Sequence, residues 1–302
     1  MITPQYLKAG DTIGIVAPAR KIVLGEIQAA IKAFQAWGLE VVLGHNLLKS
    51  DHQFAGTDVQ RTEDLQIMLD RPDIKAIIAA RGGYGTLRII DALDFSTFKQ
   101  HPKWIIGYSD ITVLHAHIHS LGFETLHATM PLNFFKSGPS DPAVEALHNG
   151  LFGKALQYAY VPSQNNKHLL RPGKTSGILV GGNLSILYAL SGSVSDIDTN
   201  GKILFIEDLD EYLYHIDRMM LQLDRSGKLK NLKGLIVGGM TQMKDNAISF
   251  GKTVEEIIFG AVKKYDFPVC FDFPSGHIAD NKALIMGRQV ELSVGDTVTL
   301  KF

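Results

Sequence analysis

A serine directly follows a short apolar stretch in Ile105-Ile106-Gly107-Tyr108-Ser109-Asp110. This pattern predicts a buried strand that ends in a sharp turn, with Asp110 opening a helix. A serine on such a turn exposes its hydroxyl, and the next N–H group can point at a developing oxyanion during acyl transfer. Ile111 stands where the G-x-S-x-G pattern has its second glycine. The alternative is that Ser109 or Asp110 only caps the helix.

Three glycines within four positions follow a second apolar stretch, in Arg81-Gly82-Gly83-Tyr84-Gly85. Glycines let the backbone approach a ligand closely, with its N–H groups free to donate. The segment does not fit the dinucleotide fingerprint, because Arg88 stands where the third glycine is required. It could supply donors to an oxyanion or a substrate carboxylate, or it could form an ordinary tight turn.

A carboxylate and a histidine follow apolar stretches in the second half of the chain. Glu207 comes after Lys202–Ile206, where we expect the chain to leave the core, and it could orient a histidine as the acid of a catalytic triad does. The acids that follow it fit a helix N-terminus, which favours negative charge. His277 follows the turn Pro274-Ser275-Gly276 and could act as a general base, although a single loop histidine is also a common surface residue.

The run His115-Ala116-His117-Ile118-His119 raises the question of a metal site. On a strand all three histidines would share a face, but the surrounding apolar spacing is helical and aligns only His115 and His119. The sequence contains no HExxH motif. We therefore expect histidines on the helix surface or between domains, with no metal and no other cofactor.

The elements that must position these groups follow from the hydrophobic pattern. In the first half, apolar stretches at 12–17, 41–43, 74–80 and 104–108 alternate with helical patterns at 26–37 and 62–69. This alternation predicts βαβ units and an open, mostly parallel sheet, in which ligands bind at the carboxyl ends of the strands. In the second half we expect strands at 177–180, 202–206, 234–237 and 269–273, a helix at 211–223 and a hairpin around Gly295-Asp296.

Length and composition limit the class of protein. The chain has 302 residues, 45% of them hydrophobic, and a formal net charge of -1. We expect an N-terminal α/β domain at 1–160, a polar, proline-containing linker at 161–175 and a smaller α+β domain at 176–302. The balanced charge argues against a nucleic-acid partner, and the apolar runs are too short to span a membrane. Because the N-terminus has no pattern of a secretory signal, the expected location is the cytoplasm.

Taken in order along the chain, these segments resemble the LD-carboxypeptidase (muramoyltetrapeptide carboxypeptidase) family of serine peptidases. The similar segments are Leu7–Ile13 with Ala17-Pro18, Arg81–Gly85, Gly107–Asp110, Gly181–Leu184, Glu207-Asp208, Tyr214 with Asp217-Arg218, and Gly276-His277. The resemblance implies a flavodoxin-like N-terminal domain, a smaller β-rich C-terminal domain, and a homodimer.

The resemblance also implies a Ser-His-Glu triad of Ser109, His277 and Glu207, split between the domains. Its substrate would be a peptidoglycan-derived tetrapeptide of cell-wall recycling, cleaved between an L-centre and a terminal D-alanine. We expect the N–H groups of Asp110 and Gly83 to form the oxyanion hole and Arg81, Gly82 and Tyr84 to bind the substrate. By its charge Arg81 could bind the free carboxylate, or its side chain could brace the loop of residues 82–85. Two alternatives remain: a hydrolase of acyl-aminoacyl adenylates similar to microcin self-immunity proteins, and a non-catalytic protein that binds an amino-acid-like ligand.

Overall fold

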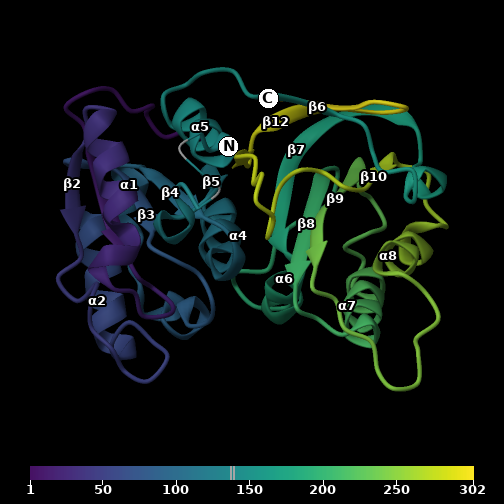
Figure 1. The fold of residues 1–302 in the computed structure, drawn as a ribbon, viewed down its shortest axis with the longest axis horizontal. Helices are drawn as coiled ribbons and strands as arrows, with labels where there is room; N and C mark the ends of the chain where they lie inside the picture. The colour runs from purple at the N-terminus through teal and green to yellow at the C-terminus, as the bar shows by residue number, and fades with distance from the viewer. Residues whose placement is uncertain (137, 139) are drawn as a thin grey trace.

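The computed structural model describes residues 1–136, 138 and 140–302 and contains two β-sheets (Figure 1). The first sheet has the strand order β11-β5-β4-β3-β1-β2, and its strands β1 to β5 run parallel. The antiparallel strand β11 comes from near the C-terminus and closes one edge. The strands are β1 (Thr12–Val16), β2 (Glu40–Leu43), β3 (Ile74–Ala79), β4 (Trp104–Gly107), β5 (Thr125–His127) and β11 (Leu284–Met286).

Helices connect the parallel strands of the first sheet, as the alternating hydrophobic pattern predicts. Helix α1 buries Ile27, Ala30, Ala33 and Phe34, which recur at helical spacing. Helix α2 begins with a capping box in which Thr57 and Gln60 bond each other's backbone N–H groups. The helices of this half are α1 (Leu24–Ala36), α2 (Asp58–Asp70), α3 (Ser96–Gln100), α4 (Thr112–Ser120) and α5 (Pro142–Leu151).

The second sheet has the order β10-β9-β8-β7-β12-β13-β6. Strands β7 to β10 pair in parallel, and β12, β13 and β6 continue the sheet in antiparallel pairing. The hairpin of β12 and β13 confirms the turn predicted at Gly295-Asp296. The elements are β6 (Gln157–Tyr160), β7 (Gly173–Asn183), β8 (Ile203–Leu209), β9 (Gly234–Thr241), β10 (Val269–Cys270), β12 (Gln289–Val294), β13 (Val298–Lys301), α6 (Leu184–Leu190), α7 (Leu213–Arg225) and α8 (Val254–Val262).

The two halves of the chain exchange strands. Strand β6 lies within 1–160 but pairs with β13 in the second sheet, and β11 from the second half pairs with β5 in the first. Strand β7 begins inside the stretch 161–175, which the sequence assigns to a linker. One buried apolar cluster also joins Ile111 and Leu114 of the first half to Leu184 and Leu204 of the second. The two sheets are therefore packed together, while the domain boundaries remain a prediction.

Helix α4 lies between the two sheets and contacts β5, β7 and α6 (Figure 1). The sequence left two places open for the histidines of this helix, its surface or a position between domains, and the surface is wrong for His115 and His119, which are buried and bond Gly107 and Thr125 of the first sheet. His117 is half-buried, and its Nδ1 lies 2.9 Å from the Ser195 hydroxyl of the other half, as expected for a histidine between domains. Among the described residues, no helix combines the length and apolar character needed to cross a membrane.

Candidate active site

Ser109 occupies the sharp turn between β4 and α4. Its backbone φ is 63°, a left-handed conformation that non-glycine residues adopt rarely and that a nucleophile turn requires. A short 3₁₀ turn, Ser109–Ile111, leads from it into α4. Gly107 has a φ of 153°, and a Cβ there would lie 2.8 Å from Cγ1 of Ile111. The glycine therefore allows the strand to turn tightly beneath Ser109.

The loop of residues 82–85, called here the glycine loop, lies against Ser109. A Cβ on Gly82 would stand 3.0 Å from Cβ and 3.3 Å from Oγ of Ser109. Gly83 and Gly85 have φ values of 118° and 145°, which only glycine adopts without strain. Tyr84 is 44% exposed at the tip of the loop. The glycine loop and the serine turn are therefore in close contact.

Glu207 and His277 form a hydrogen-bonded pair in which the glutamate is buried and the histidine is partly exposed. Nδ1 of His277 lies 2.5 Å from Oε2 of Glu207, and the backbone N–H of His277 donates to the same oxygen over 3.2 Å. The Glu207 side chain has no exposed surface. Gly276 has a φ of 109°, and a Cβ there would meet Cβ of Glu207 at 2.7 Å. The glycine before the histidine is therefore needed for the close approach of its loop.

Glu207 lies inside strand β8, which continues to Leu209 instead of ending at Ile206 as predicted. The pairing of β8 with β9 shifts register between Ile206 and Asp208. An irregularity of this kind re-aims a side chain at the edge of a site without ending the strand. The prediction that Glu207 marks the end of the strand is wrong, because Asp208 and Leu209 still pair with β9 and keep the backbone in the sheet.

Burial lowers the pKa of His277, but the hydrogen bond and negative charge of Glu207 outweigh this effect, and the net pKa is raised above its ordinary value. The neighbouring Asp208 has a pKa raised to about 7, by burial first and by the charge of Glu207 second. Burial and the same charge raise the pKa of Tyr108 to about 12, so this phenol stays protonated at neutral pH.

Tyr108 connects the serine turn to the histidine. It directly precedes Ser109, and its ring centroid lies 4.9 Å from that of His277 in an edge-on arrangement. Both rings border a cavity of about 340 Å³, which is also lined by Thr129, Asn133, Lys136, Asp141, Ala143, Leu209, Ile278, Ala279 and Asn281. A cavity of this size beside a histidine fits a small polar group of a substrate.

The structure brings some of the sequence-predicted residues together and leaves others apart. Glu207 is bonded to His277, and the serine turn meets the histidine through Tyr108. Within residues 1–136, 138 and 140–302, no hydrogen bond joins Oγ of Ser109 to His277, whose Nδ1 is bonded to Glu207. Arg81 does not line the cavity; its Nη1 donates to the backbone carbonyl of Lys21 over 3.3 Å.

Each of the two aligned histidines of α4 has a protein partner. Nε2 of His115 lies 2.9 Å from the carbonyl oxygen of Gly107, and Nε2 of His119 lies 3.1 Å from the hydroxyl of Thr125. Burial lowers the pKa of His115 to about 4 and that of His119 to about 3. Within residues 1–136, 138 and 140–302, no three metal-binding side chains are grouped so that they could hold an ion.

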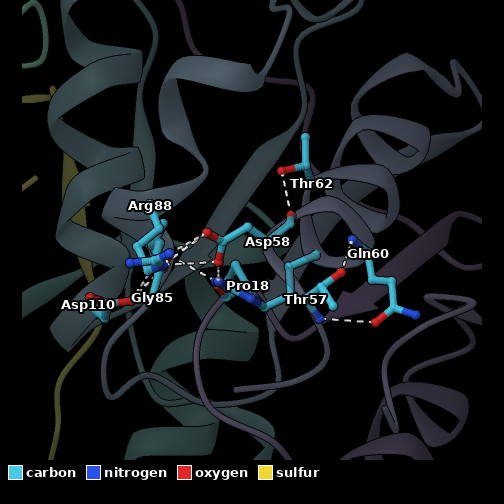
Figure 2. A network of polar contacts seen from close by, with 10 residues as sticks. Pro18, Thr57, Asp58, Gln60, Thr62, Gly85, Arg88 and Asp110 are labelled. Carbon is cyan, nitrogen blue, oxygen red and sulfur yellow. Dashed lines mark hydrogen bonds and ion pairs between the residues drawn. The ribbon is translucent and has the colours of Figure 1, made fainter. Parts of the chain in front are cut away.

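A polar network that the sequence does not indicate lies behind the glycine loop (Figure 2). Arg61 of α2 has a fully buried side chain, and its Nη1 donates to the carbonyl oxygen of Gly85 over 2.9 Å. Thr86 donates to the carboxylate of Asp110 from both its N–H and its hydroxyl group. An arginine in an amphipathic helix is normally a surface residue, so the sequence offered no signal for this contact.

The fold and the site together define a two-domain α/β protein with the features of a serine hydrolase: a strained serine turn beside a glycine loop, and a histidine bonded to a buried carboxylate. The LD-carboxypeptidase N-terminal domain model matches residues 13–128, and the LD-carboxypeptidase C-terminal domain model matches residues 176–292. The chain belongs to the LD-carboxypeptidase family.

Individual relatives support this assignment. The chain is 35% identical to a "Probable murein peptide carboxypeptidase" of Bacillus subtilis, over 97% of this chain and 92% of the relative. It is 29% identical to a microcin self-immunity protein of Escherichia coli, over 77% of this chain and 76% of that protein. The crystal structure of muramoyltetrapeptide carboxypeptidase from Oxalobacter formigenes superposes with a TM-score of 0.86 at 28% identity, covering 96% of this chain and 98% of the other.

Proposed function

We propose that this protein is a serine carboxypeptidase that removes the terminal D-alanine from a peptidoglycan-derived tetrapeptide. The observation that carries the proposal is the 2.5 Å contact between Nδ1 of His277 and the buried carboxylate of Glu207. Because Glu207 engages Nδ1, Nε2 is the nitrogen left to accept a proton from Ser109. The names of the Bacillus subtilis relative and the Oxalobacter formigenes structure support a murein peptide as substrate.

The proposed reaction is an acyl transfer to Ser109. Oγ of Ser109 attacks the carbonyl carbon of the amide bond between the L-centre and D-alanine, while His277 takes the hydroxyl proton. The N–H groups of Asp110 and Gly83 stabilise the oxyanion that forms. His277 then returns the proton to the leaving amine, the C–N bond breaks, and D-alanine departs. Water, activated by the same histidine, hydrolyses the acyl-enzyme and regenerates the serine.

The substrate test compares the murein tetrapeptide, its form with an amidated terminal carboxyl group, the pentapeptide with one further terminal residue, and an acyl-aminoacyl adenylate. We expect release of D-alanine from the murein tetrapeptide, and no release when its terminal carboxyl group is amidated, because a carboxypeptidase recognises the free carboxylate. Faster cleavage of an acyl-aminoacyl adenylate would favour the alternative suggested by the Escherichia coli relative. Binding of the tetrapeptide without turnover, and without labelling of Ser109 by a fluorophosphonate, would identify a non-catalytic binding protein. The pentapeptide tests whether an additional terminal residue is accepted.

The expected partner of the terminal carboxylate is Arg81, whose buried Nε has no hydrogen-bond partner among the described residues. Arg81→Gln should raise KM for the tetrapeptide by about 10-fold or more, since a charge-assisted bond contributes roughly 1.5–3 kcal/mol. The change in kcat should be smaller than the change in KM. Lys136 lines the cavity beside His277 and is the matched control. A rise in KM for Lys136→Gln, with none for Arg81→Gln, would assign the carboxylate to the cavity instead.

The pH dependence of kcat/KM follows from the raised pKa of His277. The general base must be neutral, so activity should rise with pH through a pKa above the ordinary value of about 6.5. The contribution of His277 to folding stability changes with pH in the opposite direction. The charged histidine stabilises the folded state below about pH 6.5, and this contribution is lost as pH rises through the higher folded-state pKa. A kcat/KM profile whose acid limb falls at or below pH 6.5 would contradict the assignment.

The resemblance to the family further supports a homodimer that acts in the cytoplasm on peptides released during cell-wall recycling. Sedimentation of the purified protein tests for the homodimer. Cell fractionation of the native host tests for the cytoplasmic location.

A further inference from the structure

The glycine loop needs an external support if it is to serve as half of an oxyanion hole. Glycine has more backbone freedom than any other residue, and the loop holds glycines at 82, 83 and 85. In the described part of the chain, the N–H groups of residues 82–85 have no hydrogen-bond acceptor. These groups are available to a ligand, but no bond of their own fixes their direction. Oxyanion stabilisation depends on donors that are held in place before the reaction.

The first support is the bond between Thr86 and Asp110. The N–H of Thr86 donates to Oδ2 of Asp110 over 2.8 Å, and its hydroxyl donates to the same oxygen over 2.6 Å. Both side chains are buried. Thr86 is the residue immediately after the glycine loop, and Asp110 is the residue immediately after Ser109. The two bonds therefore connect the end of the loop directly to the serine turn.

The second support is the guanidinium group of Arg61. Its Nη1 donates to the carbonyl oxygens of Gly85 and Pro18, and its Nη2 is paired with Asp58. A Cβ on Gly85 would stand 2.7 Å from Nη1, so the loop backbone lies directly on the guanidinium. Asp58 is held in turn by Arg88, whose Nη2 lies 2.7 Å from Oδ2 (Figure 2). Arg61 thus ties the loop to helix α2 through the carbonyl oxygen of Gly85.

We propose that Thr86 and Arg61 are positioning residues of the oxyanion hole. Acting through Asp110 and Gly85, they hold the glycine loop at a fixed distance from the serine turn. The N–H of Gly83 then keeps its place relative to the N–H of Asp110. The inference rests on the proposed function, and it assigns to the Asp110 side chain a task separate from that of its backbone N–H.

The test uses Thr86→Val, which keeps the shape of the side chain and the backbone N–H but removes the hydroxyl donor. We expect kcat for the tetrapeptide to fall roughly 10- to 100-fold, the scale of loss for a small displacement of a reacting group, with KM changed less than 3-fold. The rate at which a small fluorophosphonate labels Ser109 should fall by a similar factor, because that reagent uses the same oxyanion hole. Thr86→Ser restores the hydroxyl and should recover most of both rates.

The matched control is Thr62→Val on helix α2. The hydroxyl of Thr62 donates to the backbone carbonyl of Asp58 over 2.8 Å, whereas the bonds at Gly85 and Thr86 come from Arg61 and Asp110. Its loss should leave kcat and labelling unchanged. Arg61→Met is a second test variant. Because it removes a buried cation and its partners' bonds, its kcat and labelling rate are measured well below its own Tm.

Two results separate the possible failures. If Ser109 is labelled and the tetrapeptide is hydrolysed, but Thr86→Val matches the wild type in kcat and labelling, the positioning role is wrong. The proposed function then stands. If the wild-type protein neither hydrolyses the tetrapeptide nor labels at Ser109, the proposed function has failed, and the positioning role fails with it.

Discussion

Replacing Ser109 with alanine is expected to lower kcat for the murein tetrapeptide by about 10⁴-fold or more, because the members of a catalytic triad act as one unit. The substrate should still bind, since the hydroxyl is not needed to hold the peptide. The measurement is single-turnover release of D-alanine at saturating tetrapeptide, together with the dissociation constant of the same peptide. A variant that keeps a rate within 10-fold of wild type would show that Ser109 is not the nucleophile.

A glycine at the same position is the matched control for structural damage. Ser109 has a φ of 63°, which glycine adopts without the strain imposed by a Cβ. Ser109→Gly should therefore be as inactive as Ser109→Ala, with a Tm equal to or above that of the wild type. If both variants were inactive and both lost Tm by 10 °C or more, unfolding and not chemistry would explain the loss.

Glu207→Gln is expected to lower kcat by roughly 10³- to 10⁴-fold, as the loss of a triad carboxylate does in other serine hydrolases. The glutamine amide can donate to Nδ1 of His277, which would leave a hydrogen on Nε2 and remove its capacity to accept a proton. The charge that raises the pKa of His277 is also lost. The residual activity should therefore show an acid limb at lower pH than the wild type, measured as a kcat/KM profile.

Glu124→Gln is the matched control for the loss of a buried carboxylate. Glu124 is 4% exposed and forms an ion pair with Arg288, outside the cavity that borders His277. Its replacement should lower Tm, because it leaves Arg288 without its charge partner, but it should leave kcat within about 3-fold. Equal losses of kcat in the Glu207 and Glu124 variants would indicate a general loss of structure. The role given to Glu207 would then be wrong.

Several features of this protein could be predicted from local sequence. The apolar stretch that ends in Gly107-Tyr108-Ser109-Asp110 indicates a strand, a turn and a helix, and the structure has β4, a 3₁₀ turn and α4 in this order. The glycines of the loop indicate free N–H groups near a ligand. Local patterns succeed here because strand and helix periodicity, and the need for glycine at positive φ, depend on neighbouring residues alone.

The placement of the other groups depends on contacts between distant parts of the chain. Arg61 looks like a surface residue of an amphipathic helix, yet it is buried because the glycine loop folds over it. His115 and His119 lie on a helix that packs between the two sheets, and both are buried where they bond Gly107 and Thr125 of the first sheet. No local pattern carries this information, since it depends on which surfaces the rest of the chain presents.

By itself, the sequence determined the parallel sheet of the first half, the hairpin near the C-terminus, the serine turn, the glycine loop and the residue types of a hydrolase. The tertiary structure alone decided that Glu207 and His277, 70 residues apart, share a hydrogen bond, and that this pair lies beside the residue preceding Ser109. The same holds for the exchange of β6 and β11 between the sheets. The physical reason is that local conformation is set by short-range sterics and periodicity, whereas long-range pairing is set by the burial of the whole chain.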